Sequence, residues 1–302
     1  MRVFVTGATG FVGQAVTAEL LANGHEVTGL ARSEASARKL REAGARPVAG
    51  SLADIDTLER AADNADAVIH LAFGHDFSRF EENAAEDIKA IEAMGSALIA
   101  TNRPIIATSG AAMLQSDKAV PDEDASAHQP DSEYPRGSEA ALGRLRQQGV
   151  NAIAMRLPPS VHGVGETGFV PILIEIARQK GTSAYVDDGT HCWSAVYQAD
   201  AGRAYRLALE TGARGNLHAV AEEAIPFRQI AEVIGRRLGL PVVPVSGEEA
   251  EAHFGWFLKF AGTDMAVSSA KTRKRLGWTP SGPGLIEDID QPAYFEVTAS
   301  GG

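Results

Sequence analysis

The chain has 302 residues, of which 44% are hydrophobic and 22% charged, and this composition excludes a disordered, collagen-like or disulfide-scaffold protein. Its 28 basic and 39 acidic residues give a net charge of -11, which would repel a phosphate backbone, so nucleic acid is not expected as a partner. The single cysteine excludes an internal disulfide and a multi-thiolate zinc site, and no apolar run approaches the ~18 residues of a membrane span, so a soluble cytoplasmic protein is expected.

The first half of the chain alternates short apolar runs with helical stretches, which is the pattern of βαβ units in a parallel sheet. Strands are predicted at residues 2–6, 26–31, 46–49, 67–71, 104–109 and 152–157. Helices are predicted between them, at residues 11–23, 33–43, 55–62, 84–100 and 137–148. The sequence therefore predicts a doubly wound α/β domain with a parallel sheet over residues 1–157.

After this domain the alternation breaks at a loop rich in proline and glycine. Helices are predicted at 171–179, 199–210 and 227–238, and a strand at 216–221. We interpret residues 158–193 and 222–302 as a smaller substrate-binding lobe, and residues 194–221 as a segment that returns to the first domain. Residues 116–132, rich in Asp, Pro, Ser and Ala, are expected to form a mobile loop.

The strongest motif follows the first predicted strand and opens the first predicted helix. It reads Thr6-Gly7-Ala8-Thr9-Gly10-Phe11-Val12-Gly13. In such a turn Gly7 permits the tight bend, Gly10 allows the backbone to approach a pyrophosphate, and Gly13 allows the helix to pack closely on the strand. The first N–H groups of the helix face the anion. The motif therefore predicts a dinucleotide site that includes Thr9, Phe11 and Val12.

The spacing TGxxGxxG resembles that of the short-chain dehydrogenase/reductase superfamily in its extended or atypical form, the NAD-dependent epimerase/dehydratase-like group. Further similarities follow in the same order along nearly the whole chain. They are His70-Leu71-Ala72, Thr108-Ser109-Gly110, the segment 156–163 (similar to "RPxxVYG"), Asp188-Gly189, Asp200-Ala201 and the segment 276–280 (similar to "LGWxP"). The resemblance implies a Rossmann-type domain that binds NAD or NADP, with Leu71, Ala72, Phe73 and Pro158 at the cofactor.

The end of the second predicted strand decides between NAD and NADP. An acidic side chain there would bind the ribose hydroxyls of NAD and repel the additional phosphate of NADP. This chain instead has Arg32 and Ser33, which offer a planar fork of donors and a hydroxyl to a 2′-phosphate. We therefore predict NADP (NADPH) as the cofactor. The alternative is that Arg32 is an exposed residue at the start of the next helix.

The resemblance also implies a catalytic serine, a tyrosine, and a lysine four residues after the tyrosine. Ser109, at the end of a predicted strand, is the candidate serine, with Thr108 as the alternative. Tyr134 fits the tyrosine, but Ser138 stands where the lysine is required. Tyr134 is therefore either a catalytic tyrosine that works without a lysine or a chance tyrosine in a loop. Arg136 is either a substitute positive charge or a residue that faces solvent or a cofactor phosphate.

Aromatic residues suit an apolar, cyclic or aryl substrate. They are Phe73, His162, His191, Trp193, Tyr197, Phe254, Trp256, Phe257 and Phe260. Trp193 is predicted to contact the substrate, because the resemblance places there an arginine that pairs with the diphosphate in nucleotide-sugar enzymes, and tryptophan cannot do so. His162 is either a substrate contact or a structural hydrogen-bonding residue. His191 and Cys192 lack the spacing of a metal site, and none is expected.

Together these features predict an NADP-dependent oxidoreductase, a reductase of a carbonyl or imine on a small apolar or aryl molecule. A free phenol has a pKa near ~10, so it donates a proton at neutral pH better than it accepts one, which favours reduction. The first alternative is an NAD-linked epimerase or dehydratase of a nucleotide sugar, disfavoured by Arg32, Trp193 and Ser138. The second is a non-catalytic, NADP-binding redox sensor, which the missing lysine favours. The resemblance also implies a homodimer through residues 84–100 and 137–148.

Overall fold

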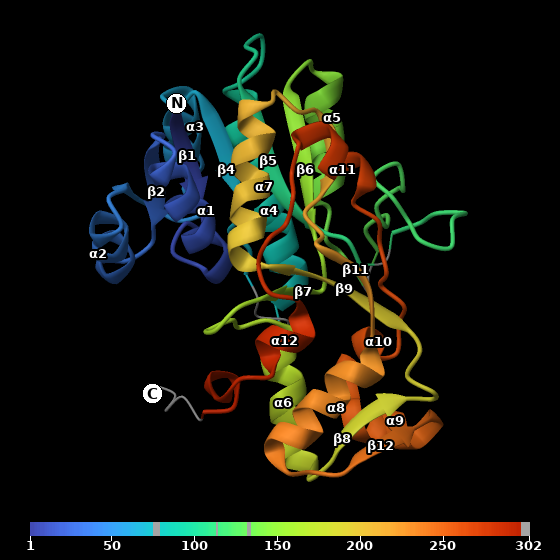
Figure 1. Ribbon diagram of the computed structural model, residues 1–302. Coiled ribbons are helices and arrows are strands. Elements are labelled where there is room, and N and C mark those ends of the chain that lie inside the picture. The colour runs from blue at the N-terminus through green and yellow to red at the C-terminus, as the bar shows by residue number, and fades with distance from the viewer. Residues whose placement is uncertain (75–78, 113, 132–133, 297–302) are drawn as a thin grey trace.

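The main sheet has seven parallel strands in the order β10-β6-β5-β4-β1-β2-β3 (Figure 1). The computed structural model describes residues 1–74, 79–112, 114–131 and 134–296. The strands are β1 (Arg2–Thr6), β2 (Glu26–Ala31), β3 (Arg46–Ala49), β4 (Ala67–His70), β5 (Pro104–Gly110), β6 (Asn151–Leu157) and β10 (Gly215–His218). The strand order reverses between β1 and β4, and in such sheets ligands bind outside the carboxyl ends of the strands at that point. The predicted doubly wound fold is confirmed.

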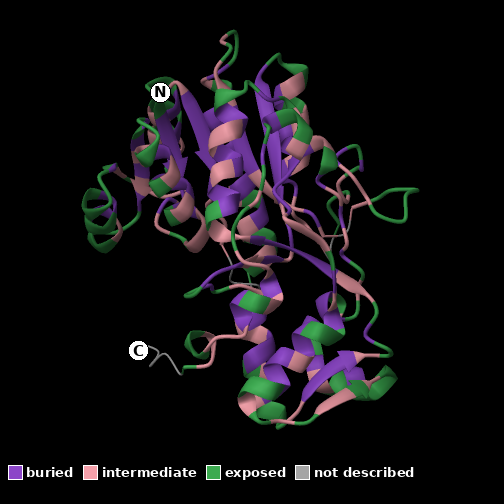
Figure 2. Cartoon of the chain, viewed as in Figure 1, coloured by how far each residue is buried: buried purple, intermediate pink, exposed green. Residues whose placement is uncertain are grey.

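Helices cover both faces of this sheet. One face carries α1 (Phe11–Ala22) and α7 (Gln198–Glu210), and the other carries α3 (Ile55–Asp63), α4 (Phe80–Ser96) and α5 (Ser138–Gln147); α2 (Glu34–Glu42) follows β2. In β1, Val3 and Val5 join the core on the α1 side, whereas Phe4 joins the core on the other side. The central strands β1, β4 and β6 are buried along most of their length because helices cover both faces of the sheet, as Figure 2 shows.

The second lobe lies beyond a three-stranded sheet and has its own hydrophobic core (Figure 1). The intervening sheet comprises β7 (Ser160–His162), β9 (Cys192–Tyr197) and β11 (Glu222–Pro226). The lobe comprises α6 (Phe169–Lys180), β8 (Ser183–Val186), α8 (Phe227–Leu238), β12 (Val242–Val245), α9 (Gly247–Phe254), α10 (Leu258–Ala261) and α12 (Leu285–Ile289). Within the described ranges, no helix combines the length and apolar character needed to cross a lipid bilayer.

The chain returns to the first domain after the lobe, which corrects the predicted boundary. Helix α11 (Ala270–Leu276) and the following Trp278 belong to the core beside α1 and α7, so residues 222–302 are not all part of the lobe. The indole N–H of Trp278 donates to the Asp200 carbonyl at 3.1 Å, and the Asp200 carboxylate accepts the backbone N–H of Gly282 at 2.7 Å. These bonds join the two sequence motifs around Asp200 and Trp278.

Much of the segment expected to be a mobile loop is held against the C-terminal part of the chain. Glu123 accepts the backbone N–H and the hydroxyl of Thr272 at 2.5 and 2.6 Å. The fully buried Arg156 donates to the carbonyl of Ala125 at 2.9 Å. Buried hydrogen bonds of this kind fix the backbone, so the expectation of a mobile loop is wrong for the described residues around 121–125.

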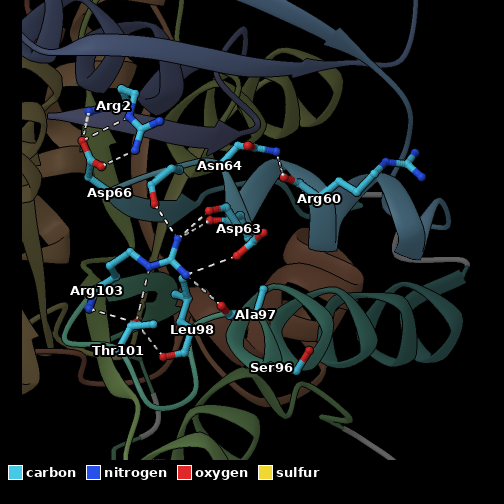
Figure 3. A network of polar contacts seen from close by, with 12 residues as sticks. Arg2, Arg60, Asp63, Asn64, Asp66, Ser96, Ala97, Leu98, Thr101 and Arg103 are labelled. Carbon is cyan, nitrogen blue, oxygen red and sulfur yellow. Dashed lines mark hydrogen bonds and ion pairs between the residues drawn. The ribbon is translucent and has the colours of Figure 1, made fainter.

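Arg103 precedes β5 and connects the ends of two helices at the amino end of that strand (Figure 3). Its guanidinium donates to the carbonyls of Ala62, Asp63 and Ala65 at the end of α3, at 3.3, 2.7 and 2.8 Å, and to that of Ala97 after α4 at 2.9 Å. The last carbonyls of a helix have no partner within the helix, and their partial negative charge attracts a cation. Arg103 supplies both the donors and the charge.

Arg103→Met should lower the free energy of unfolding by about 2–3 kcal/mol, because several carbonyls lose a charged donor at once. Denaturant titration followed by circular dichroism measures this loss. Arg60→Met is the matched control, since Arg60 is exposed and its side chain donates only to Thr57 within the described contacts. The control should stay within about 0.5 kcal/mol of wild type. Equal losses of unfolding free energy in the two variants would show that Arg103 does not stabilise the ends of α3 and α4.

Candidate active site

The glycine-rich turn connects β1 to α1 at the reversal point of the sheet. Gly7 has φ +70°, and a Cβ atom there would lie 2.6 Å from the backbone nitrogen of Ala72. A Cβ atom on Gly13 would overlap the carbonyl oxygen of Gly7. Gly10 differs, because its φ is -74° and a Cβ atom would meet only the Gly7 oxygen, at 3.3 Å. The fold therefore requires glycine at positions 7 and 13, whereas Gly10 is exposed and a Cβ atom there would press on a single backbone oxygen.

The N-terminus of α1 is left ready for an anion. Gly10 is the N-cap residue, no side chain caps the helix, and its first turn has no acidic residue. The first backbone N–H groups, which belong to Phe11, Val12 and Gly13, carry the positive end of the helix dipole. The carbonyl of Thr9 accepts a hydrogen bond from Gln14 Nε2 at 3.0 Å. The open space at Gly10 and these uncapped N–H groups fit the pyrophosphate of a dinucleotide.

The residues after β4 lie against this turn. The backbone N–H of Leu71 donates to the Thr6 carbonyl at 3.2 Å, and that of Ala72 to the Thr6 hydroxyl at 3.4 Å. Pro158, which is buried, follows the end of β6 two strands away. The structure thus places Leu71 and Ala72 beside the glycine turn and Pro158 at the same edge of the sheet.

Arg32 and Ser33 follow β2, at the same edge of the sheet. Arg32 is exposed, and its guanidinium has no acceptor among the residues that the structure describes. Ser33 is the N-cap of α2, where its hydroxyl accepts the backbone N–H of Ser36 at 3.2 Å. Arg32 is therefore open to an anion, while Ser33 already has a structural role as a helix cap.

Ser109 and Tyr134 both lie at the carboxyl end of β5. Ser109 is half-buried, and the hydroxyl of Tyr134 lies 3.8 Å from where a Cβ atom on the next residue, Gly110, would be. Successive side chains of a strand point to opposite faces, so that position is on the other face of β5 from the Ser109 side chain. The alternative serine-equivalent, Thr108, is already engaged, because its hydroxyl contacts the His70 carbonyl at 3.0 Å and the Tyr205 hydroxyl at 2.7 Å.

A buried polar network occupies the place of the missing lysine. The hydroxyl of Ser138, 1% exposed, donates to Asp87 Oδ2 at 2.6 Å. The other oxygen of Asp87 lies 3.0 Å from His70 Nε2, and His70 Nδ1 lies 2.7 Å from the Thr6 hydroxyl. On the other side, Arg136 Nε donates to Ser138 Oγ at 3.2 Å. The network therefore runs from the end of β1 to Arg136.

Asp87 is the centre of this network. Burial opposes ionisation of its carboxyl most strongly, but the hydrogen bond and charge of His70, the charge of Arg136 and the bond from Ser138 hold its pKa below the ordinary value. The sequence analysis missed Asp87. The available signal was a carboxylate at the helical spacing of Ala84 and Ile91, on the face of α4 that is otherwise apolar.

Arg136 lies at the end of β5. Its Nη2 donates to the carbonyl of Thr108 at 3.0 Å, and its guanidinium carbon lies 4.4 Å from the centre of the Phe73 ring. These contacts hold the guanidinium at the carboxyl end of β5, so Arg136 is not a fully solvated side chain.

Aromatic rings line up beside Tyr134. Phe73 contacts Phe80 edge-to-face with ring centres 6.0 Å apart, Phe80 contacts Tyr134 at 5.6 Å, and Tyr134 contacts His128 at 5.8 Å. We call Phe73, Phe80, Tyr134 and His128 the aromatic row. Sequence analysis selected Phe73 and Tyr134 but missed Phe80 and His128, because nothing local shows that they meet.

The predicted substrate contact of Trp193 is wrong. Trp193 is fully buried in the core of the lobe, packs edge-to-face on Phe227, and donates its indole N–H to the Phe260 carbonyl at 3.1 Å. Phe254, Phe257 and Phe260 belong to the same core, so they do not surround a substrate either. Trp256 is exposed.

His162 has the structural role. It is fully buried, and its Nδ1 lies 2.9 Å from Asp288 Oδ2. His191 stacks on Phe227 with ring centres 5.0 Å apart, and the Cys192 thiol donates to the Thr190 carbonyl at 3.3 Å. In the described part of the chain, no three His, Cys, Asp or Glu side chains are arranged to hold a metal ion.

Comparisons with known proteins agree with this fold. The sequence pattern of the NAD dependent epimerase/dehydratase family matches residues 3–220. An uncharacterized protein of Schizosaccharomyces pombe is 47% identical over 98% of this chain and 100% of its own. A 4-hydroxy-2-methyl-3-oxo-4-farnesyl-3,4-dihydroquinoline-1-oxide ketoreductase of Stigmatella aurantiaca is 26% identical over 92% of each chain.

Among solved structures, a dTDP-glucose 4,6-dehydratase of Streptomyces venezuelae with NAD bound has a TM-score of 0.75. It is 20% identical, and the alignment covers 98% of each chain. The match to the family spans most of this chain, including the glycine turn, the end of β5 and β10. The chain therefore belongs to the NAD dependent epimerase/dehydratase family, within the short-chain dehydrogenase/reductase superfamily of oxidoreductases and epimerases.

Proposed function

We propose that the protein is an NADP-dependent reductase of a carbonyl or imine on a small apolar or aryl substrate. The observation that carries this proposal is the position of the Tyr134 hydroxyl at the carboxyl end of β5, 3.8 Å from the Cβ position of Gly110. This hydroxyl supplies a donor for a reacting oxygen or nitrogen, and we assign Ser109, near the end of the same strand, as a second donor. The aromatic row offers an apolar surface beside them.

The chain's own residues divide the work as follows. When bound, NADPH supplies a hydride to the electrophilic carbon. The hydroxyl of Ser109 donates a hydrogen bond to the substrate oxygen, and Tyr134 transfers its phenolic proton to that oxygen as negative charge develops there. Position 138 supplies a hydroxyl and no ammonium group, so we assign Tyr134 the donation of a proton and not its removal.

One finding favours reduction over nucleotide-sugar chemistry. Relatives do not decide between the two, because a ketoreductase and a UDP-glucose 4-epimerase of Lacticaseibacillus casei are each 26% identical to this chain. Ser138 stands where the resemblance implies a lysine, and its hydroxyl donates a hydrogen bond to Asp87. In the epimerase or dehydratase alternative, a tyrosine must also remove a proton, and a phenol without a neighbouring ammonium group is a poor base.

Oxidation of NADPH across a panel of aryl ketones, aldehydes and cyclic imines tests the proposal. We expect turnover of at least one of these classes and no binding of UDP- or dTDP-sugars. Tight NADPH binding with no turnover of any carbonyl or imine would instead indicate the redox-sensing regulator. Binding and oxidation of a nucleotide sugar would indicate the epimerase or dehydratase.

The preference for NADP is tested at Arg32, which is exposed at the end of β2. We expect NADPH to bind more tightly than NADH, and Arg32→Asp to reverse the order, because it replaces a charge-assisted pair by repulsion of the 2′-phosphate. Arg32→Asp should weaken NADPH by about 10- to 100-fold, as measured by fluorescence titration. Arg38→Asp, on the exposed side of α2, is the control for net charge. Equal wild-type affinities for both cofactors would contradict the assignment.

A further inference from the structure

Arg136 is a half-buried cation without a direct carboxylate partner. No described carboxylate forms a salt bridge with it, and Asp87 reaches it only through the hydroxyl of Ser138. The fully buried Arg156, by contrast, has a bidentate pair with Glu139 at 2.8 and 2.7 Å. A cation that is partly removed from water is stabilised by a nearby anion, so a bound anion would stabilise Arg136.

The guanidinium of Arg136 is held by one edge only. Nε and Nη2, which share an edge, donate to Ser138 and to the Thr108 carbonyl. Phe73 covers one face of the plane. At the opposite end, Nη1 has no acceptor among the described residues. The contacts thus orient a rigid two-donor fork, formed by Nη1 and Nη2, whose geometry matches a carboxylate.

The position of this fork relates it to the reacting group. Arg136 lies two residues after Tyr134 and bonds to the carbonyl of Thr108, which immediately precedes Ser109. Phe73, under the guanidinium, is the first ring of the aromatic row that leads to Tyr134. An anion on the fork and an apolar group on the row would therefore lie on either side of the end of β5, where Tyr134 is.

We propose that Arg136 binds the carboxylate of the substrate, so that the substrates are 2- or 3-oxo acids with an aryl or alkyl group. This inference rests on the proposed reductase function and adds the acidic group to the substrate. The carboxylate lies on Nη1 and Nη2 of Arg136, the carbonyl lies at Ser109 and Tyr134, and the apolar group lies on the aromatic row. Asp87 is a positioning residue, which fixes Arg136 through Ser138.

Matched acids and esters test the proposal kinetically. Wild-type protein should reduce phenylglyoxylate and 3-oxo-3-phenylpropanoate with kcat/KM at least about 10-fold above that of their methyl esters. Arg136→Met should lower kcat/KM about 10- to 100-fold for the acids and less than about 3-fold for the esters, because only the acids lose a charge-assisted bond. Arg136→Lys, which keeps the charge and loses the fork, should recover only part of the loss. Arg144→Met is the control, because Arg144 lies on α5 and pairs with Glu92 on α4. It should leave kcat/KM unchanged for the acids and for the esters.

Calorimetric binding of the same acids and esters to the NADP+ complex separates this inference from the proposed function. If no carbonyl compound is reduced, the proposed function fails, while weaker binding of phenylglyoxylate to Arg136→Met still supports the carboxylate site. Equal losses for acid and ester overturn it. A loss of affinity for NADP+ itself in Arg136→Met or Arg136→Lys also overturns it, since the anion would then be a cofactor phosphate.

Discussion

Gly10→Val should weaken NADPH binding by about 100-fold or more while the protein remains folded. The backbone conformation of Gly10 is accessible to any residue, and a Cβ atom there would meet only the Gly7 carbonyl oxygen, at 3.3 Å. The fold therefore needs glycine less at this position than at positions 7 and 13, since only the Gly7 oxygen would have to shift, by a few tenths of an ångström. The side chain would instead occupy the space that a pyrophosphate needs over the first turn of α1. Fluorescence titration with NADPH measures the affinity, and denaturant titration measures the stability.

Two other glycines serve as controls for this experiment. Gly13→Ala should destabilise the fold itself, because its Cβ atom would overlap the carbonyl of Gly7. Gly143→Ala, within α5 and with no atom near its Cβ position, should bind NADPH normally and be slightly more stable than wild type. Unchanged NADPH affinity in Gly10→Val would show that the glycine turn has only a structural role.

The positions of the strands in the chain could be predicted from the sequence because most strands of the main sheet are short apolar runs bounded by turn residues. A strand that is buried on both faces must be apolar along its length, and this local requirement is visible without any contact being known. The predicted ends were less accurate, as α4 shows: it was predicted at 84–100 and spans Phe80–Ser96. Helix ends depend on capping and on packing, which extend beyond the local pattern.

The glycine turn was also predictable, because the residues that bind a pyrophosphate lie next to one another in the chain. The remainder of the site is assembled from distant segments. Asp87 and Ser138 are 51 residues apart, and Thr6 and His70 are 64 residues apart, so no local pattern identifies either hydrogen bond. The sequence also does not show whether an aromatic side chain is buried in the core or exposed in a pocket. Trp193 was therefore predicted to contact the substrate, but it lies in the core.

The network at Ser138 explains how the site is constructed without the lysine that the resemblance implies. A lysine at position 138 would be buried against Asp87. The serine hydroxyl instead accepts a hydrogen bond from Arg136 and donates one to Asp87, so it connects the guanidinium to the carboxylate. The positive charge is thereby moved from the helix to the loop between Tyr134 and α5. There it is a guanidinium, whose planar fork of donors matches an anion. We assign proton transfer to the hydroxyl groups.

Tyr134→Phe should lower the kcat of reduction by about 100-fold or more, the usual magnitude for loss of a positioned general acid, with NADPH affinity nearly unchanged. Phenylalanine preserves the ring that contacts Phe80 and His128, so the aromatic row remains in place and only the proton donor is lost. Steady-state kinetics with an aryl ketone gives kcat, and fluorescence titration gives the affinity for NADPH. Tyr185→Phe, in the second lobe, is the matched control and should retain full activity.

The outcome for Tyr134→Phe also decides where the proton comes from. His162 is not an available donor, because it is fully buried with Nδ1 against Asp288. Full reductase activity in Tyr134→Phe would therefore leave Ser109 or water as the source. Ser109→Ala separates these two, since a reaction that uses water would survive both substitutions. If Tyr134 is the donor, Tyr134→Phe lowers kcat strongly. The double variant Tyr134→Phe/Ser109→Ala should then lose less activation free energy than the sum of the two single losses, because both hydroxyls bind the same substrate oxygen.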